Sequence, residues 1–117
     1  MDKKYVTITG TKYYYDTKPF KVGSIIMCKK DYDNEYDDEA IRAYLPFIGT
    51  VGYIGNSTHT VAKGTSSAGK IYDSVDDVFA VRVLFVVYNT VICEIADMTE
   101  AEIAEHIAKQ VTAGMYI

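Results

Sequence analysis

The sequence predicts a mainly β protein: a single small β-barrel of about six strands, with one or two short helices and a C-terminal helix. The 117 residues include 12 Val, 12 Ile, 11 Thr, 11 Tyr and 4 Phe but only two Leu, and β-branched and aromatic side chains favour strands. Short apolar stretches between turn residues recur along the chain, which is typical of a barrel. The composition excludes a helical bundle, a coiled coil and a disordered tail.

Four strands are predicted in the first half of the chain, each as a short apolar or alternating stretch. They cover residues 5–11, 24–29, 40–45 and 50–54. Pro19 and Gly23 mark the turn before the second strand, and residues 46–49 form the turn of a hairpin between the third and the fourth. Residues 31–39 carry six acidic side chains, and we expect a loop there because such charges repel one another and resist burial.

The middle of the chain carries weaker signals. Asn56 or Ser57 is a suitable N-cap for a short helix that continues through Lys63, and Gly64 is placed to end it. Residues 65–70 are small and polar, and they predict a flexible loop.

The last third of the chain predicts two strands and a helix. Residues 78–87 and 91–95 are the strands. Thr99 and Glu102 match a capping box, which predicts a helix that ends at about Thr112. One face of this helix carries an apolar stripe that we expect to pack on the outside of the barrel or over one end. The stripe consists of Ile103, Ile107 and Val111.

The charge distribution disfavours tight, non-specific binding to duplex DNA, which requires many basic groups to neutralise phosphates. The net charge is −4 and the isoelectric point is near 5.0. The charge is uneven, since residues 1–30 carry +5 and residues 31–39 carry −6. A small site that holds a few nucleotides remains compatible with this pattern.

The sequence also indicates a compartment. No apolar run approaches the roughly 20 residues that cross a bilayer, so we expect a soluble protein without a membrane partner. Cys28 and Cys93 both lie in apolar runs. We expect them to be buried, reduced thiols of a cytoplasmic protein, and a disulfide is the alternative.

The acidic loop invites comparison with a calcium site. Asp31, Asp33 and Glu35 alternate as the ligands of an EF-hand do, but Tyr36 and Arg42 stand where that motif requires Gly and Glu. An EF-hand is therefore excluded, and a solvated charged loop or a looser cation site remains.

The two Cys and two His lack the spacing of zinc ligands. Phosphate-binding loops and nucleophile motifs are absent too, so we expect no catalytic residue, metal or cofactor.

Aromatic, basic and amide side chains provide the remaining functional signal. Lys12 and Tyr13 end the first predicted strand, and Asn34, Tyr36 and Asp37 lie in the acidic loop. Small barrels bind single-stranded nucleic acid by stacking bases on such rings and holding phosphates with nearby lysines. The residues alone leave a structural alternative open, in which the tyrosines pack at the barrel rim and Asn34 supports a turn.

Three motifs in the first half of the chain resemble those of the HIRAN domain family. Residues 10–14, Gly-Thr-Lys-Tyr-Tyr, resemble its first-strand motif. The family's central signature is matched by two stretches. These are residues 23–27 and then residues 33–41, which read Asp-Asn-Glu-Tyr-Asp-Asp-Glu-Ala-Ile. Residues 49–54, Gly-Thr-Val-Gly-Tyr-Ile, resemble the strand that follows. The three motifs occur in the family's order and spacing.

The resemblance implies an OB-like β-barrel over residues 1–96. Residues 97–117, which we expect to form an amphipathic helix packed on the barrel, are an addition to the family's domain. The resemblance also implies a non-catalytic module that binds single-stranded DNA, captures the 3′-hydroxyl end and serves DNA repair. The alternative function is a protein-interaction module that does not bind nucleic acid and meets its partner through the C-terminal helix.

The family's motifs also imply the residues of the DNA site. These are Lys12, Tyr13, Asn34, Tyr36, Asp37 and Tyr53. By resemblance, Tyr36 would stack on the terminal base, Asp37 would accept the 3′-hydroxyl and Lys12 would contact a phosphate. The other two tyrosines would line the pocket, and Asn34 would brace the loop or contact DNA.

Overall fold

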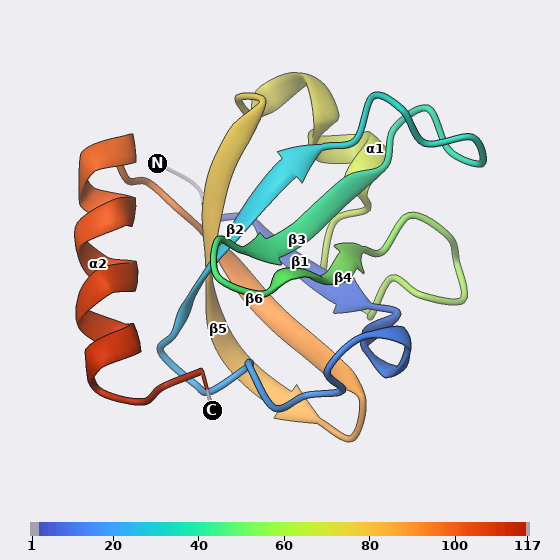
Figure 1. Ribbon diagram of the computed structural model, residues 1–117. Coiled ribbons are helices and arrows are strands. Elements are labelled where there is room, and N and C mark those ends of the chain that lie inside the picture. Colours follow the sequence, from blue (N-terminus) through green and yellow to red (C-terminus); the bar gives the residue numbers. More distant parts are fainter. Residues whose placement is uncertain (1–2, 117) are drawn as a thin grey trace.

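The chain folds as a closed antiparallel barrel of six strands in the order β1-β4-β3-β2-β5-β6 (Figure 1). The computed structural model describes residues 3–116. Residues 1, 2 and 117, at the ends of the two expected segments 1–96 and 97–117, lie outside it. The strands are β1 (Tyr5–Thr9), β2 (Ile25–Lys30), β3 (Ile41–Leu45), β4 (Gly49–Ile54), β5 (Val78–Val87) and β6 (Thr90–Ala96). The helices are η1 (Thr11–Tyr13), α1 (Ala68–Ile71), η2 (Tyr72–Ser74) and α2 (Glu100–Thr112), the two η elements being 3₁₀ turns. The predicted fold class is confirmed.

All six predicted strands form within two residues of their expected bounds. The largest difference is at the end of β1, which stops at Thr9 although the alternating pattern continues to Thr11. Gly10 adopts a left-handed conformation with φ of 73° and begins η1, because glycine enters this region without steric cost. The acidic residues 31–39 form a loop, as expected.

The helix expected from residue 57 to Lys63 does not form. The Thr60 hydroxyl accepts a hydrogen bond from the Ser57 backbone N–H at 3.2 Å, and this local bond competes with helix formation. The short helix is instead α1, which lies in the stretch predicted to be a loop. Ser67 is its N-cap and accepts a backbone N–H of the first turn, which is a capping signal that the prediction missed.

The barrel interior holds the core. It is built from the inward residues of all six strands, which include Val6, Ile8, Ile26, Ile41, Val51, Val81, Val83 and Val91. Cys28 and Cys93 lie in the same interior as free, buried thiols, so the expectation of reduced cysteines is confirmed. Burial raises the pKa of both thiols above the ordinary value.

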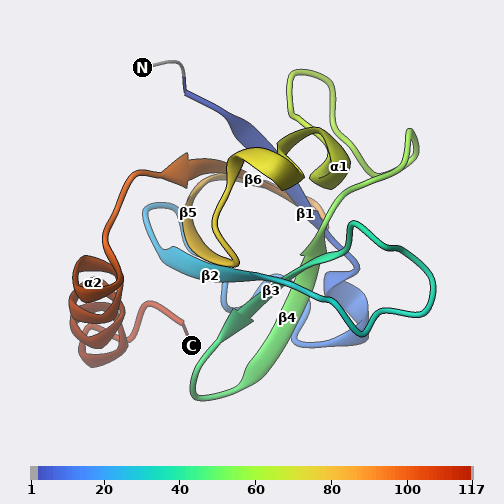
Figure 2. The ribbon, with the colours of Figure 1, turned by 90° about the horizontal axis from the view of Figure 1, so that it is seen from above.

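The C-terminal helix α2 lies along the flank of the barrel (Figures 1 and 2). Its capping box forms as predicted, with reciprocal hydrogen bonds between Thr99 and Glu102. Ile103 and Ile107 are buried, whereas Val111 is 43% exposed. The expected packing of the stripe is therefore correct for the first two residues and wrong for Val111, whose side chain borders a surface groove instead of the barrel wall.

Two side chains of the C-terminal segment bind the backbone of β2. The Ile25 N–H donates to Gln110 Oε1 at 2.8 Å, and the Tyr116 hydroxyl donates to the Ile25 carbonyl at 2.7 Å. Strand β3 pairs with β2 only from Met27 onward, so within the described residues these side chains replace the missing strand partner. Partial burial raises the pKa of Tyr116 to about 12. The helix is thus joined to the barrel by hydrogen bonds as well as by apolar packing.

Candidate nucleic-acid interface

Four of the six predicted site residues border one open depression of about 460 Å³. They are Asn34, Tyr36, Asp37 and Tyr53. Its lining comes from the acidic loop, from the end of β4 and from the segment that follows β4. These parts of the chain lie on the side of the barrel remote from α2 (Figures 1 and 2). Asn56 and Thr60 also border the depression, and no motif in the sequence marked these two residues.

Asn34 fixes the conformation of the acidic loop. Its Oδ1 accepts hydrogen bonds from the backbone N–H groups of Tyr36 at 2.9 Å and Asp37 at 3.0 Å, as Asn does in a local side-chain turn. Its Nδ2 donates to Asp31 Oδ2 at 3.4 Å. The loop therefore presents the Tyr36 ring to solvent, and that side chain is 94% exposed.

Asp37 joins the acidic loop to its neighbours. Its Oδ1 accepts from the Glu39 N–H at 2.9 Å, and its Oδ2 accepts from Asn56 Nδ2 at 2.9 Å. Asn56 in turn accepts the Gly69 N–H at 2.8 Å, which links the site to α1. An ionised carboxylate has about four acceptor positions, so Asp37 retains capacity for a further donor.

Tyr53 forms one wall of the depression from β4. Its hydroxyl donates to Asp31 Oδ2 at 2.9 Å. Desolvation by partial burial, together with this hydrogen bond, raises the pKa of Tyr53 to about 12. At neutral pH the phenol is therefore a protonated donor held by Asp31, the same carboxylate that receives the Asn34 amide.

Lys12 and Tyr13 do not line the depression. They lie on η1, which follows β1, and Thr9 at the end of β1 pairs with Tyr53. The turn therefore begins beside the depression. The Tyr13 side chain is 74% exposed, and Lys12 Nζ lies 5.1 Å from the centroid of its ring. The predicted site is thus divided between a depression and an adjacent aromatic turn.

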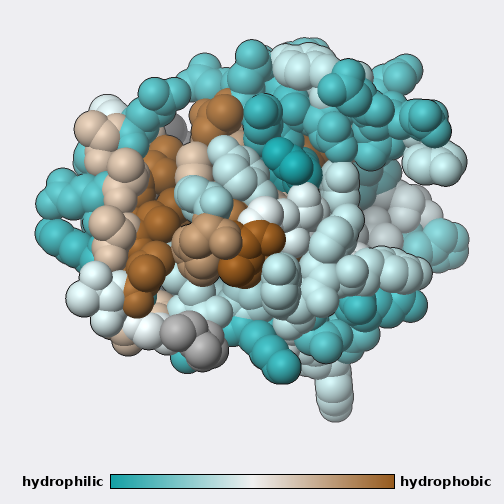
Figure 3. All heavy atoms as spheres, viewed as in Figure 1, coloured by the Kyte–Doolittle hydropathy of each residue, from teal (hydrophilic) through white to brown (hydrophobic). Residues whose placement is uncertain are grey.

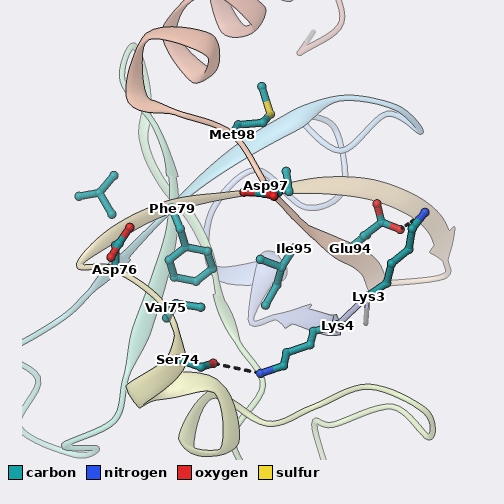
Figure 4. A pocket seen from close by; sticks show the side chains of 12 residues that line it. Lys3, Lys4, Ser74, Val75, Asp76, Phe79, Glu94, Ile95, Asp97 and Met98 are labelled. Atoms are coloured by element: carbon teal, nitrogen blue, oxygen red, sulfur yellow. Dashed lines mark hydrogen bonds and ion pairs between the residues drawn. The ribbon is translucent and has the colours of Figure 1, made fainter. Parts of the chain in front are cut away.

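A larger cleft, of about 560 Å³, lies elsewhere on the barrel (Figure 4). Phe79 contributes to its apolar floor. Lys3 forms an ion pair with Glu94 at 3.4 Å, and Lys4 donates to Ser74 at 3.2 Å. Two aspartates also line this cleft. Because its cations already have partners and its acids repel phosphates, the cleft is unsuited to nucleic acid.

Residues 3–116 contain no group of three His, Cys, Asp or Glu side chains that could hold a metal ion. In the same part of the chain, no helix has the length and apolarity needed to cross a membrane.

A model of the HIRAN domain family matches residues 2–71, which is more than half of the chain and includes all three motifs. The chain belongs to the HIRAN domain family. Its structure is similar to the crystal structure of the HIRAN domain of human HLTF, with a TM-score of 0.57 and 16% identity over 92% of this chain and 87% of that chain.

A crystal structure of a protein from Lactobacillus plantarum is also similar, with a TM-score of 0.54 and 17% identity. The match covers 80% of this chain and 93% of that chain. At such identities the likeness to both structures concerns the fold. No curated protein matches the sequence. The family expected from the motifs is therefore confirmed by the family model.

Proposed function

We propose that this HIRAN domain is a non-catalytic module that binds single-stranded DNA and holds its 3′-hydroxyl end in the depression beside Tyr36. Membership of the family supports a nucleic-acid-binding module in general. The observation that carries the finer proposal is the placement of an almost fully exposed aromatic ring on a braced loop, directly beside a carboxylate.

Tyr36 supplies the stacking surface. Its ring is 94% exposed, so a base that stacks on it removes apolar surface from water without first displacing a protein side chain. The two hydrogen bonds to Asn34 hold the backbone beneath the ring, which lowers the entropy lost on binding. Stacking of one base on an aromatic side chain contributes about 1–3 kcal/mol.

Asp37 supplies the preference for an end. A carboxylate repels internal phosphates, whereas a free 3′-hydroxyl is a donor that it can accept. A hydrogen bond to a charged acceptor contributes roughly 1.5–3 kcal/mol. Lys12 and Tyr13 lie on η1, close to Tyr53, and by this proposal they contact a phosphate and a base of the captured end itself.

The test is a fluorescence-anisotropy titration with short single-stranded oligonucleotides that differ only at the 3′ terminus. A 3′-phosphate removes the donor and adds repulsion, so we expect it to bind about ten-fold or more weakly than the 3′-hydroxyl. Equal affinity for the two termini would contradict capture of the 3′ end.

A second candidate function is protein interaction beside the C-terminal helix. It is favoured by an apolar groove of about 400 Å³ whose lining includes Tyr15, Phe47 and Val111. Each of these side chains is at least 43% exposed. Figure 3 shows apolar atoms gathered along α2 and beside it. Surfaces of this kind commonly serve association.

The charges at the two ends of this apolar surface fit a second copy of the chain. Lys18 borders the groove, and Glu100 borders the apolar hollow that continues along α2, so an antiparallel copy would bring opposite charges together. Sedimentation equilibrium tests this candidate. We expect a dimer that the Val111→Lys substitution weakens, and a monomer at all concentrations would contradict it.

A further inference from the structure

We infer that Lys29 and Arg42 form a phosphate-binding row that holds the DNA backbone on the 5′ side of the captured end. The row would extend the site from the depression across the outer face of β3 and β2. This inference rests on the proposed function and adds the path that the strand follows over the barrel.

The register of three strands places the two cations in line with the depression. Tyr53 on β4, which borders the depression, pairs with Arg42 on β3, and Arg42 pairs with Lys29 on β2. Neighbouring strands lie about 4.8 Å apart, so the row reaches about 10 Å from Tyr53. The flanking residues Ile41 and Ala43 are buried, so Arg42 lies on the outer face, which Figure 1 turns toward the reader.

The charges of the row lack an internal counterpart. Like charges directly opposite each other on neighbouring strands are destabilising, and Lys29 and Arg42 form such a pair. Within residues 3–116, neither side chain forms an ion pair. Arg42 donates to the Thr50 hydroxyl at 3.3 Å. Both cations are therefore available to an external anion.

Aromatic rings beside the cations favour a nucleic acid as that anion. The Arg42 guanidinium carbon lies 5.2 Å from the centroid of the Tyr44 ring, and Tyr53 adjoins the pair on the other side. Cations with aromatic rings beside them are the usual surface for a single strand. The planar guanidinium can also bind a phosphate through two hydrogen bonds. Since the 3′ end lies in the depression, the backbone over this row leads toward the 5′ end.

The experiment compares a dinucleotide with an eight-nucleotide strand, each with a free 3′-hydroxyl, in anisotropy titrations over a range of salt concentrations. The variants are Lys29→Gln, Arg42→Gln and the double substitution. Lys4→Gln is the matched control, because Lys4 is an exposed lysine that contacts Ser74 in the cleft of Figure 4 and does not belong to the row. Thermal unfolding checks that each variant is folded. Relief of the like-charge repulsion offsets the loss of the Arg42–Thr50 hydrogen bond, so we expect the melting temperatures to stay close to that of the unmodified protein.

We expect the eight-nucleotide strand to bind more tightly than the dinucleotide. Each substitution in the row should weaken binding of the longer strand about two- to five-fold. Each should also reduce the magnitude of its logarithmic salt slope by about 0.7, since one phosphate contact is lost. Binding of the dinucleotide should not change in any variant, and Lys4→Gln should resemble the unmodified protein in both titrations.

The outcomes separate this inference from the proposed function. If the dinucleotide binds but the longer strand gains nothing, or if the double variant keeps its salt slope, the row is wrong and the end site stands. If Lys4→Gln lowers the slope as much as Arg42→Gln does, the effect is one of net charge and the row is wrong. If neither strand binds, both proposals fail.

Discussion

The side-chain amide of Asn56 donates a hydrogen bond to Asp37 Oδ2 at 2.9 Å, and this bond joins the acidic loop to the segment after β4. The carboxylate proposed to accept a 3′-hydroxyl therefore also has a structural role. The two roles can be separated, because Asn56 shares the hydrogen bond but carries no charge.

The first prediction compares Asp37→Ala with Asn56→Ala. Both substitutions remove the link between the loop and the segment after β4, so both should lower the free energy of unfolding by about 1 kcal/mol. Only Asp37→Ala removes the acceptor for the DNA end. It should therefore weaken binding of 3′-hydroxyl strands and reduce the discrimination against 3′-phosphate strands. Titrations of both termini with both variants measure this difference. Loss of discrimination in Asn56→Ala to the same extent would assign Asp37 a purely structural role.

The second prediction concerns Tyr36. Replacement by Ala should weaken binding of 3′-hydroxyl and 3′-phosphate strands alike, by about 1–3 kcal/mol, because the stacking surface is lost for both. The melting temperature should stay unchanged, since the side chain is 94% exposed. Tyr36→Phe is the matched control and should bind as the unmodified protein does. Retained affinity in Tyr36→Ala would show that the base stacks elsewhere.

The strands and α2 could be predicted from the sequence because their signals are local. Alternation defines the strands, and the capping box of Thr99 and Glu102 fixes the start of α2. The exposure of Val111 could not be foreseen, since it depends on where the barrel wall ends. The short helix was misplaced because Ser57 and Thr60 carry the residue types of a cap but bond to each other.

The candidate site was predictable only in part. The motif residues of the acidic loop and Tyr53 meet at one depression because β4 and the loop before β3 emerge on the same side of the barrel. No sequence motif marks Asn56, and its role depends on a contact with Asp37, which lies 19 positions away in the sequence. The alignment of Lys29 with Arg42 likewise follows from strand register, which a single sequence does not specify.

The third prediction concerns the attachment of α2. Gln110→Ala leaves the Ile25 N–H without its 2.8 Å acceptor, and an unsatisfied, partly buried donor costs about 1–3 kcal/mol. Urea unfolding should show a loss of this size. Glu105→Ala is the control on the same helix, since it removes only an exposed ion pair with Lys109 and should cost less than 1 kcal/mol. An equally small effect of Gln110→Ala would mean that apolar packing alone holds the helix.

The fourth prediction is that the free energy of unfolding falls as the pH rises from about 10 to about 12. The pKa of Tyr53 is raised from 10.0 to about 12, by partial burial and by its hydrogen bond to Asp31. A group whose pKa is higher in the folded than in the unfolded state binds its proton more tightly when folded. Its contribution is therefore complete below pH 10 and is lost as the pH passes through the folded value.

The variant Tyr53→Phe has no hydroxyl to ionise at this position, so its stability should decline less steeply over this range in urea titrations at successive pH values. Tyr32 and Tyr116, whose pKa values are also raised to about 12, and the buried thiols of Cys28 and Cys93, whose pKa values are raised by burial, contribute to the decline that remains in that variant. If stability falls with pH equally in Tyr53→Phe and in the unmodified protein, folding does not raise the pKa of Tyr53.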